Sequence, residues 1–515
     1  MTQDVYARAV QLIASDRWAE AARELAPSLA ATPSTPLLAL AAEVSLRFGA
    51  YAEACDLARQ SAQHMTAPLD PIVAARIARL YRRLELSPEL GHLFDTQAPV
   101  RWPPSLAAEM AILASSASLF DHAARIAREP MHDAPQNADA HYVAGLLAMF
   151  DGDRDRSLDH LRQALTIEPR MGNAHWLVAM QDDVDGASAH VDAMRGALPG
   201  VAPVSENAAY LHFSLHRRLH DLGLYREAWA ALEAGWRVVR QIDPYDPDTD
   251  ERLFAALRDV PMPAKVPSGT DGEPRLIFIV GMFRSGTTLI ERVLTTHPDV
   301  VDGGETYQFT AAFREAADSD GRGPVDLELV RRAHAVDFDQ VRVRFMNYAR
   351  WRAAGRPVLT EKLPANFLNV PFILRALPSA TIVHLRRDPI DTCFSNLRTY
   401  FRGAAPYSNS PVDMARYYCA YDALMAHWSE QAPGRIVEVE YSAFVANPDV
   451  ESARLLEACG LAVPASPHKT LSMPRSTTAS AADVGKGILR NRGGAWRPYE
   501  HELVEMRNLL DDRCS

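Results

Sequence analysis

Apolar residues recur every three to four positions through roughly the first 240 residues, which are rich in alanine and leucine. This spacing predicts amphipathic helices. After residue 273, short apolar runs bounded by turn signals take over. RLIFIVG (275–281) and ATIVHLRR (380–387) predict buried parallel strands, whereas the alternation in RIVEVEY (435–441) predicts a strand nearer an edge. Because helical stretches separate these runs, residues 274–515 predict an α/β domain with a central parallel sheet.

The helical part also repeats itself at a period of about 34 residues. RWAEAARELA, from Arg17, returns 33 residues later as AYAEACDLAR, from Ala50. Similar phrases begin at Phe120, Arg154 and Gly223. The pattern resembles the tetratricopeptide repeat, whose helix pairs stack into a solenoid because one pair cannot bury its apolar face alone. We therefore predict a tetratricopeptide-like solenoid of about six helix pairs over residues 1–240. An unrelated helical bundle would also fit.

Residues 241–273 carry Pro, Asp and Gly around one short helical stretch and predict a linker. The net charge of −11 gives no sign of a nucleic-acid binder. No run of 18 apolar residues exists, so no membrane span is expected. The first residues predict an amphipathic helix and not a signal peptide.

The five cysteines are scattered and lack the spacing of a metal site. They are Cys55, Cys393, Cys419, Cys459 and Cys514. This usage fits a reducing compartment and argues against a disulfide framework or a zinc site. We accordingly expect a cytoplasmic protein whose cysteines serve core packing or stand at the surface without a role.

The segment GMFRSGTTL (281–289) follows the first predicted strand and begins a helix. A turn at the carboxyl end of a parallel strand is where α/β sheets bind ligands, and the helix start offers free N–H groups to an anion. Gly281 and Gly286 permit close approach of the backbone. Arg284 adds a permanently charged donor, and Ser285, Thr287 and Thr288 add hydroxyl groups. The pattern predicts an anion-binding loop, although a capped helix start is the simpler explanation of such a turn.

The loop lacks the lysine of the P-loop signature G-x-x-x-x-G-K-[ST]. Asp388 follows a later strand, as a metal-binding acid would, but Arg386 and Arg387 directly precede it. A nucleoside triphosphate with Mg²⁺ is therefore disfavoured. A shorter donor that needs no metal fits better.

GMFRSGTTL resembles the 5′-phosphosulfate loop of sulfotransferases that use 3′-phosphoadenosine 5′-phosphosulfate (PAPS), and it is especially similar to the tyrosylprotein branch. The resemblance covers most of residues 275–515, while the helical part resembles the N-terminal part of bacterial tetratricopeptide-repeat sulfotransferases. It implies that the loop binds the cofactor through Arg284, Ser285, Gly286, Thr287 and Thr288. It implies no metal.

Three further phrases carry the resemblance. The family binds the 3′-phosphate with an arginine and a serine eight residues later, as Arg387 and Ser395 stand in RRDPIDTCFS. In DGGETYQF, Glu305 stands 21 residues after Arg284, the spacing of the tyrosylprotein catalytic base. In LTEKLPANF, Lys362 stands 25 residues before Arg387, the spacing of a lysine that stabilises the sulfate and bridging oxygen, with Arg284 beside it. A capped surface helix, a loop acid and a solvated lysine are the plain structural alternatives.

A late segment rich in Ser, Thr and Gly resembles the loop with which the family closes its cofactor site. Ser472 is the candidate for a second active-site hydroxyl, although the alignment there needs a gap. Lys486, ten residues before Trp496, and Arg492 are alternatives for the 3′-phosphate. Tyr441 matches a family tyrosine near the adenine, and a buried strand-end tyrosine would look the same.

The resemblance implies sulfuryl transfer from PAPS to an acceptor hydroxyl, leaving 3′,5′-ADP. A peptide tyrosine held with help from the repeats is one acceptor; a glycan or a small molecule is another. The repeats could equally serve assembly, including a homodimer. The alternatives are a P-loop kinase-like phosphotransferase and a repeat-based binding protein whose α/β part senses 3′,5′-ADP without catalysis.

Overall fold

The structure is a computed structural model, and it describes residues 2–133, 136–181, 183–263, 272–463 and 493–513. The chain divides into two compact units that are interleaved in sequence. Unit 1 joins Met1–Pro135 to Thr306–Ala354, and unit 2 joins Gln136–Glu305 to Gly355–Ser515.

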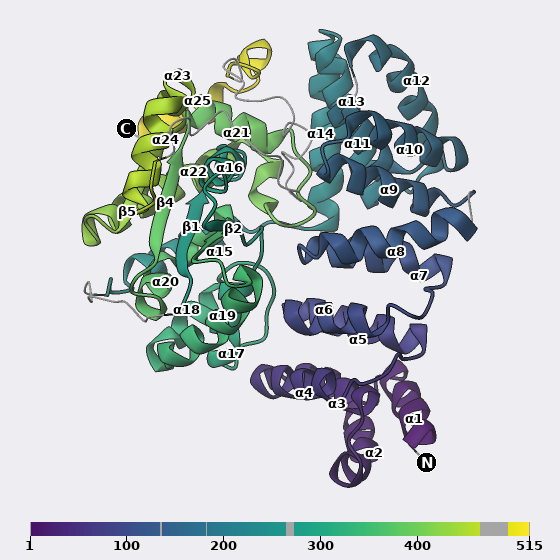
Figure 1. Cartoon of the computed structure of the whole chain (residues 1–515). Coiled ribbons are helices and arrows are strands. Elements are labelled where there is room, and N and C mark those ends of the chain that lie inside the picture. Colours follow the sequence, from purple (N-terminus) through teal and green to yellow (C-terminus); the bar gives the residue numbers. More distant parts are fainter. Residues whose placement is uncertain (1, 134–135, 182, 264–271, 464–492, 514–515) are drawn as a thin grey trace. The chain divides into compact units, whose positions relative to one another are not determined.

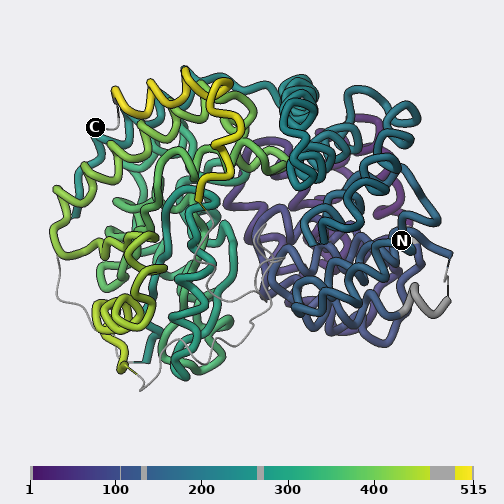
Figure 2. Tube along the Cα trace, turned by 90° about the horizontal axis from the view of Figure 1, so that it is seen from above, coloured from purple at the N-terminus to yellow at the C-terminus, as the bar shows by residue number. Residues whose placement is uncertain are grey.

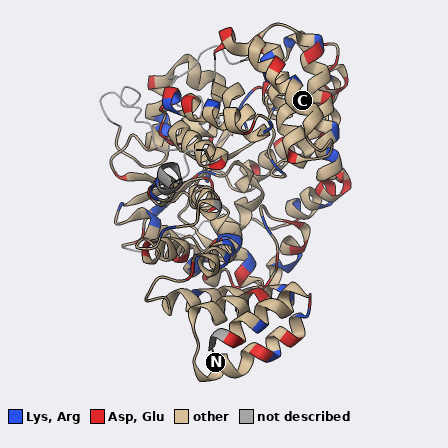
Figure 3. Cartoon of the chain, turned by 90° about the vertical axis from the view of Figure 1, so that its right-hand side faces the viewer, with Lys and Arg blue, Asp and Glu red and all other residues tan. Residues whose placement is uncertain are grey.

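Unit 1 is all-helical. Its elements are α1 (Thr2–Ala14), α2 (Trp18–Ala31), α3 (Thr35–Arg47), α4 (Tyr51–Gln63), α5 (Pro71–Arg83), α6 (Ser87–Thr96), α7 (Pro104–Ser116), α8 (Phe120–Asp133), α17 (Gln308–Ala316), α18 (Leu327–Arg332), η3 (Ala333–Ala335) and α19 (Phe338–Ala353). Helices α1–α8 pack in consecutive pairs, and α17 packs on α4 and α19. Both acidic and basic residues lie on the helices nearest the N-terminus (Figure 3).

The helical periodicity predicted for the N-terminal half is confirmed. In the described residues, seven helix pairs follow one another, where about six were expected. Their first helices begin at Thr2, Thr35, Pro71, Pro104, Ala138, Gly172 and Glu206, which are 33 to 36 residues apart. Local capping explains such boundaries: before α5, the Asp70 carboxylate accepts hydrogen bonds from the N–H groups of Ile72 and Val73, and Pro71 opens the helix.

Unit 2 holds the remaining repeat helices and a parallel sheet (Figure 1). The repeat helices and their successor are α9 (Ala138–Phe150), α10 (Arg154–Ile167), α11 (Gly172–Gln181), η1 (Val184–Gly186), α12 (Ala187–Ala197), η2 (Leu198–Gly200), α13 (Glu206–Asp221), α14 (Tyr225–Ile242) and α15 (Pro247–Arg258). The strands are β1 (Arg275–Gly281), β2 (Val300–Asp302), β3 (Val358–Glu361), β4 (Thr381–Arg386) and β5 (Ile436–Glu440). The other helices are α16 (Thr287–Leu294), η4 (Pro364–Asn369), α20 (Val370–Ala376), α21 (Pro389–Leu397), η5 (Pro406–Asn409), α22 (Pro411–Gln431), α23 (Tyr441–Ala446), α24 (Pro448–Ala458), η7 (Arg497–Tyr499) and α25 (Val504–Arg513).

The sheet has the order β2-β3-β1-β4-β5, and every strand pair is parallel. Strand β5 lies at an edge, as its alternating sequence predicts. On one face, Ile277 and Ile279 of β1 join a core with Ile290 of α16 and Leu455 of α24. Helix α25 packs along α22 (Figure 2). The predicted fold class, an all-helical N-terminal region followed by a P-loop-like domain with a parallel sheet, is confirmed.

Within unit 2 the repeat helices bind directly to the α/β part. The indole N–H of Trp236 on α14 donates a buried 2.8 Å hydrogen bond to the carbonyl of Leu397 at the end of α21. The guanidinium of Arg240 donates to the carbonyl of Asn409 at 2.7 Å. These contacts anchor α14 beside α21, the helix that carries Ser395, one of the two predicted 3′-phosphate residues.

Most of the described cysteines are core residues. Cys55, Cys393 and Cys459 are free and buried, as core packing requires, whereas Cys419 is disulfide-bonded. A single bonded cysteine is no disulfide framework, and the spacing of the cysteines gave no sign of it, because spacing does not report which side chains meet in the fold. No helix in the described part of the chain is long and apolar enough to cross a membrane.

Candidate active site

The candidate residues gather at one edge of the sheet. Because all strands are parallel, their carboxyl ends lie together, and each strand leads into one predicted site residue or segment. The pairs are β1 with residues 281–286, β2 with Glu305, β3 with Lys362, β4 with Arg387 and β5 with Tyr441. Residues from 281 to 441 thus converge on one edge.

The loop after β1 leaves no room for side chains at its two glycines. A Cβ at Gly281 would lie 2.8 Å from the carbonyl oxygen of Leu385, and one at Gly286 would lie 2.9 Å from the ring of Tyr441. Gly286 has φ 110° and directly precedes α16, so no side-chain cap covers the N-terminus of that helix. The N–H groups at the start of this helix can therefore face an anion. The Ser285 hydroxyl donates to the carbonyl of Met282 at 2.8 Å and so closes the loop on itself.

Arg284 and Arg387 lie in one polar cluster above the loop. The Nε of Arg284 donates to the hydroxyl oxygen of Ser395 at 3.3 Å, and Nη1 of Arg387 donates to the carbonyl of Arg284 at 3.1 Å. The Arg387 guanidinium also lies over the Tyr441 ring, 4.9 Å from its centroid. Arg284 has φ 66°, a left-handed conformation that is uncommon for a residue with a side chain. The structure thus brings four predicted cofactor residues into contact.

Helix α21 presents Ser395 to this cluster, and its local sequence explains how. The Asp388 carboxylate caps the helix by accepting from the N–H of Asp391 at 2.9 Å, and Pro389 occupies the first turn. Asp388 is thus the N-cap of α21. Asp391 in turn accepts a 2.7 Å hydrogen bond from the N–H of Gly494, which holds the chain against α21 after the late segment.

Glu305 and Lys362 form an ion pair after β2 and β3. The Lys362 ammonium donates to Oε1 of Glu305 at 2.8 Å. The Gly303 N–H donates to the carbonyl of Thr360 at 2.8 Å, and a Cβ at Gly303 would overlap that carbonyl. The backbone therefore follows β3 closely enough to bring Glu305 to Lys362.

A second carboxylate, Glu291 on α16, faces the same lysine. Its Oε2 lies 3.7 Å from the Lys362 ammonium, and its Oε1 is buried without a hydrogen-bond partner among the described residues. Burial raises the pKa of Glu291 well above its ordinary value, and the nearby Asp302 raises it further. Burial alone would lower the pKa of Lys362, which is 1% exposed, but Glu305 and then Glu291 outweigh it, so the pKa is raised. Glu305 and Glu291 thus flank the buried Lys362 ammonium, and both act to raise the pKa of this lysine.

Three predicted site residues, Ser472, Lys486 and Arg492, lie outside the described residues. Within the described ranges, no group of three or more His, Cys, Asp or Glu is placed to hold a metal ion.

Residues 274–465 match the model of the Sulfotransferase family. The C-terminal half of the chain carries a sulfotransferase-family domain. A putative protein-tyrosine sulfotransferase of Caenorhabditis briggsae is 25% identical to the chain over 185 residues, which cover 35% of the chain and 64% of that relative. An uncharacterized protein of Aquifex aeolicus (strain VF5) is 26% identical over 346 residues, covering 64% of the chain and 45% of the relative. The chain thus spans less than two thirds of either relative.

Among solved structures, the sulfotransferase domain from the curacin biosynthetic pathway is 14% identical to the chain. The match covers 46% of the chain and 96% of that domain, with a TM-score of 0.33.

Sequence reasoning missed two residues that support the site in this sulfotransferase domain. Glu291 faces Lys362, and the amide of Asn396 donates to the carbonyl of Phe283 at 2.7 Å, which ties the loop to α21. The signal for Glu291 was a charged residue four positions after Thr287 in an otherwise apolar helix start. Asn396 gave no such signal, because its partner is a backbone carbonyl 113 residues away.

Proposed function

We propose that the chain transfers a sulfuryl group from PAPS to an acceptor hydroxyl, with residues 274–515 as the catalytic domain, 241–273 as the linker and 1–240 as the repeat domain. The observation that carries the proposal is the convergence described above. An anion loop with two arginines and an ion-paired carboxylate stand at one carboxyl edge of a parallel sheet. A sulfotransferase needs these two sets of groups together.

The residues present fit an anionic nucleotide. The N-terminus of α16 has no side-chain cap, and the two glycines let the loop pack closely against Leu385 and Tyr441, an arrangement that would suit an anion at the helix start. Arg284 would bind the 5′ end of PAPS with the loop, and Arg387 with Ser395 would bind its 3′-phosphate. Tyr441 already forms a side of this cluster and would lie near the adenine. Of the late segment, Ser472, Lys486 and Arg492 are proposed to complete the site.

PAPS, when bound, supplies an activated sulfuryl group on a phosphate leaving group. The chain's own contribution is positioning and charge, as in phosphoryl transfer. Glu305 would accept the proton of the acceptor hydroxyl on a carboxylate oxygen, once Oε1 separates from the Lys362 ammonium. Lys362 and Arg284 would hold positive charge where negative charge grows on the leaving oxygen.

The raised pKa of Lys362 supports this role, because it keeps the ammonium charged although the side chain is buried. Glu291, on the other side of Lys362, adds to the raised pKa of the lysine, so the ammonium would stay charged for Glu305 and an incoming anion. The acceptor is proposed as a hydroxyl compound, with a peptide tyrosine bound with help from the repeats as the first candidate. A glycan and a small molecule are to be tested beside it.

The test compares Glu305→Gln with the matched control Glu430→Gln, an exposed glutamate on α22. With ³⁵S-labelled PAPS and cell extract, Glu305→Gln should lose about 10²–10⁴-fold in transfer rate. Calorimetric binding of 3′,5′-ADP should stay near that of the parent, and Glu430→Gln should change neither quantity. Label found in protein, carbohydrate or small molecules identifies the acceptor class.

Two results would overturn the proposal. Magnesium-dependent phosphate transfer from ATP would show a kinase-like enzyme. Tight binding of 3′,5′-ADP without transfer to any acceptor would show a non-catalytic sensor.

A further inference from the structure

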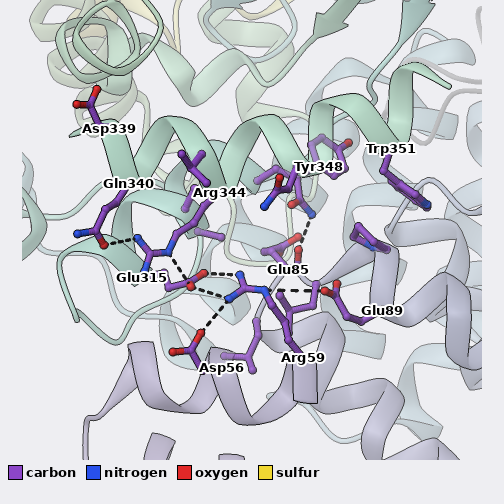
Figure 4. Close-up of a pocket in the computed structure, with 18 residues that line it drawn as sticks. Asp56, Arg59, Glu85, Glu89, Glu315, Asp339, Gln340, Arg344, Tyr348 and Trp351 are labelled. Atoms are coloured by element: carbon purple, nitrogen blue, oxygen red, sulfur yellow. Dashed lines mark hydrogen bonds and ion pairs between the residues drawn. The ribbon is translucent and has the colours of Figure 1, made fainter. Parts of the chain in front are cut away.

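Two cavities in unit 1 differ in how their charges are paired. The first, of about 590 Å³, is lined by α4, α6, α17 and α19 (Figure 4). At its centre the buried Glu315 carboxylate accepts from both terminal nitrogens of Arg59, at 2.7 and 2.6 Å, and lies 2.7 Å from Nε of Arg344. Its central charges satisfy one another, so this cavity makes no demand for a charged ligand.

The second cavity has about 570 Å³ and is strongly basic. Its charged lining residues are Arg79, Arg82, Arg83, Arg314, Arg322 and Glu85. The acids that pair with three of these arginines, Glu109, Asp320 and Asp326, are not among the lining residues. Five arginines therefore border the cavity, whereas these three counter-charges do not. In a chain with a net charge of −11, such a surplus is local and specific.

Two arginines that line this cavity, Arg83 and Arg314, carry three buried donors without an acceptor among the described residues. Arg314 is 2% exposed, and its Nη2 donates to the Asp326 carboxylate at 2.8 Å and to the carbonyl of Pro324 at 2.9 Å. Its Nε and Nη1, and the Nε of Arg83, are buried without a hydrogen-bond partner among the described residues. Buried donors are nearly always paired, so unpaired ones on charged groups point to a missing acceptor.

The kind of donor indicates the chemistry of that acceptor. Arginine side chains donate pairs of N–H groups to the oxygens of phosphate and sulfate groups as well as to carboxylates, and the unpaired N–H groups here belong to two separate arginines that line the cavity. The cavity is also in the size range that holds an organic ligand and is much larger than an inorganic ion needs. A Cβ at Gly321 would overlap the Arg314 guanidinium, so glycine at this position lets Arg314 stay where it is.

We propose that this cavity binds the sulfate or phosphate group of an organic ester through Arg83 and Arg314. Arg79, Arg82 and Arg322 add positive charge around the anion. The site lies wholly in unit 1 and is distinct from the candidate active site in unit 2. Anion binding in this cavity requires no sulfuryl transfer. This proposal therefore goes beyond the proposed function and is tested independently of it.

The test is calorimetric titration of the full chain with 4-nitrophenyl sulfate and 4-nitrophenyl phosphate. Saturating 3′,5′-ADP occupies the nucleotide site first. The neutral 4-nitroanisole and the carboxylate 4-nitrobenzoate serve as probes of charge and shape. Arg83→Gln and Arg314→Gln should each weaken ester binding by about tenfold or more. The matched control Arg331→Gln, an exposed arginine on α18, should bind as the parent does.

The relative affinities of the two esters decide between a sulfated and a phosphorylated ligand. Because Arg314→Gln also breaks the ion pair with Asp326, the melting temperature of this variant is measured. Gly321→Ala is a second variant, which would displace the Arg314 guanidinium but keep every charge. Failure of both esters to bind, tighter binding of the carboxylate or the neutral probe, or equal affinity in Arg83→Gln and Arg331→Gln would overturn the proposal. Binding only in the absence of 3′,5′-ADP would assign the anion to the nucleotide site instead.

Discussion

The buried ammonium of Lys362 donates a 2.8 Å hydrogen bond to the carboxylate of Glu305, which is itself partly exposed. The buried Glu291 carboxylate also lies near the Lys362 ammonium, whereas the Glu305 side chain is partly exposed to solvent. The positive charge of Lys362 is therefore buried and fixed in place, while the Glu305 carboxylate can be reached from solvent. A base that must meet an incoming acceptor needs such access, whereas a charge that stabilises a leaving group needs to stay in place.

Lys362→Met should lower the rate of sulfuryl transfer by about 10²–10³-fold. Methionine keeps roughly the volume of the lysine side chain but removes the positive charge near the leaving oxygen. Affinity for 3′,5′-ADP should change much less than the rate, which calorimetry and ³⁵S transfer measure side by side. An equal loss in both would make Lys362 a binding residue only.

Glu291→Gln should keep most of the activity, because glutamine has the shape and charge of a protonated glutamic acid. The folded protein holds the pKa of Glu291 well above its ordinary 4.5, so folding takes up a proton and stability falls as pH rises from 4.5 toward the folded pKa. Glutamine does not titrate, so the variant should not lose stability in this way. The free energy of unfolding of the variant should therefore increase relative to that of the parent as pH rises. Urea denaturation at pH 4.5, 6 and 7.5 checks the trend. A variant that instead loses stability relative to the parent as pH rises would show that Glu291 is ionised.

Arg387→Ala should weaken binding of 3′,5′-ADP by about 2–5 kcal/mol if the ion pair with the 3′-phosphate is desolvated. Binding of 5′-AMP, which lacks that phosphate, should change little. Arg386→Ala is the matched control, because this neighbour is about half exposed and pairs with Asp422 instead. Similar losses in the two variants would mean that general charge, and not a specific contact, attracts the nucleotide.

Gly286→Ala should impair nucleotide binding by about tenfold or more, since its Cβ would meet the Tyr441 ring at 2.9 Å and its φ of 110° disfavours alanine. Gly434→Ala separates the two causes. Gly434 also has a positive φ, 73°, but a Cβ there would meet nothing within 4 Å. The control should lose stability alone, as thermal melting and calorimetry show. Unchanged nucleotide affinity in Gly286→Ala would remove the loop from the cofactor site.

The interleaving of the two units bears on how the site is built. Glu305 ends one segment of unit 2, and the chain then enters unit 1 for residues 306–354 before it returns as β3 and Lys362. The two members of the ion pair are therefore separated in sequence by helices that pack on α4 and α6. Nothing in the apolar pattern distinguishes α17 and α19 from helices that cover a sheet, because both kinds need one apolar face.

The sequence by itself determined the elements and the local chemistry of the site. Helical and strand periodicity, the glycine turn and the cap at Asp388 all act over a few residues, so they can be read from the order of amino acids. Only the tertiary structure decided that Glu291 stands behind Lys362, that Asn396 holds the loop through Phe283, and that Arg314 and Arg83 share a cavity. These relationships depend on which strands and helices become neighbours and on how deeply each group is buried, and both arise from packing between distant parts of the chain.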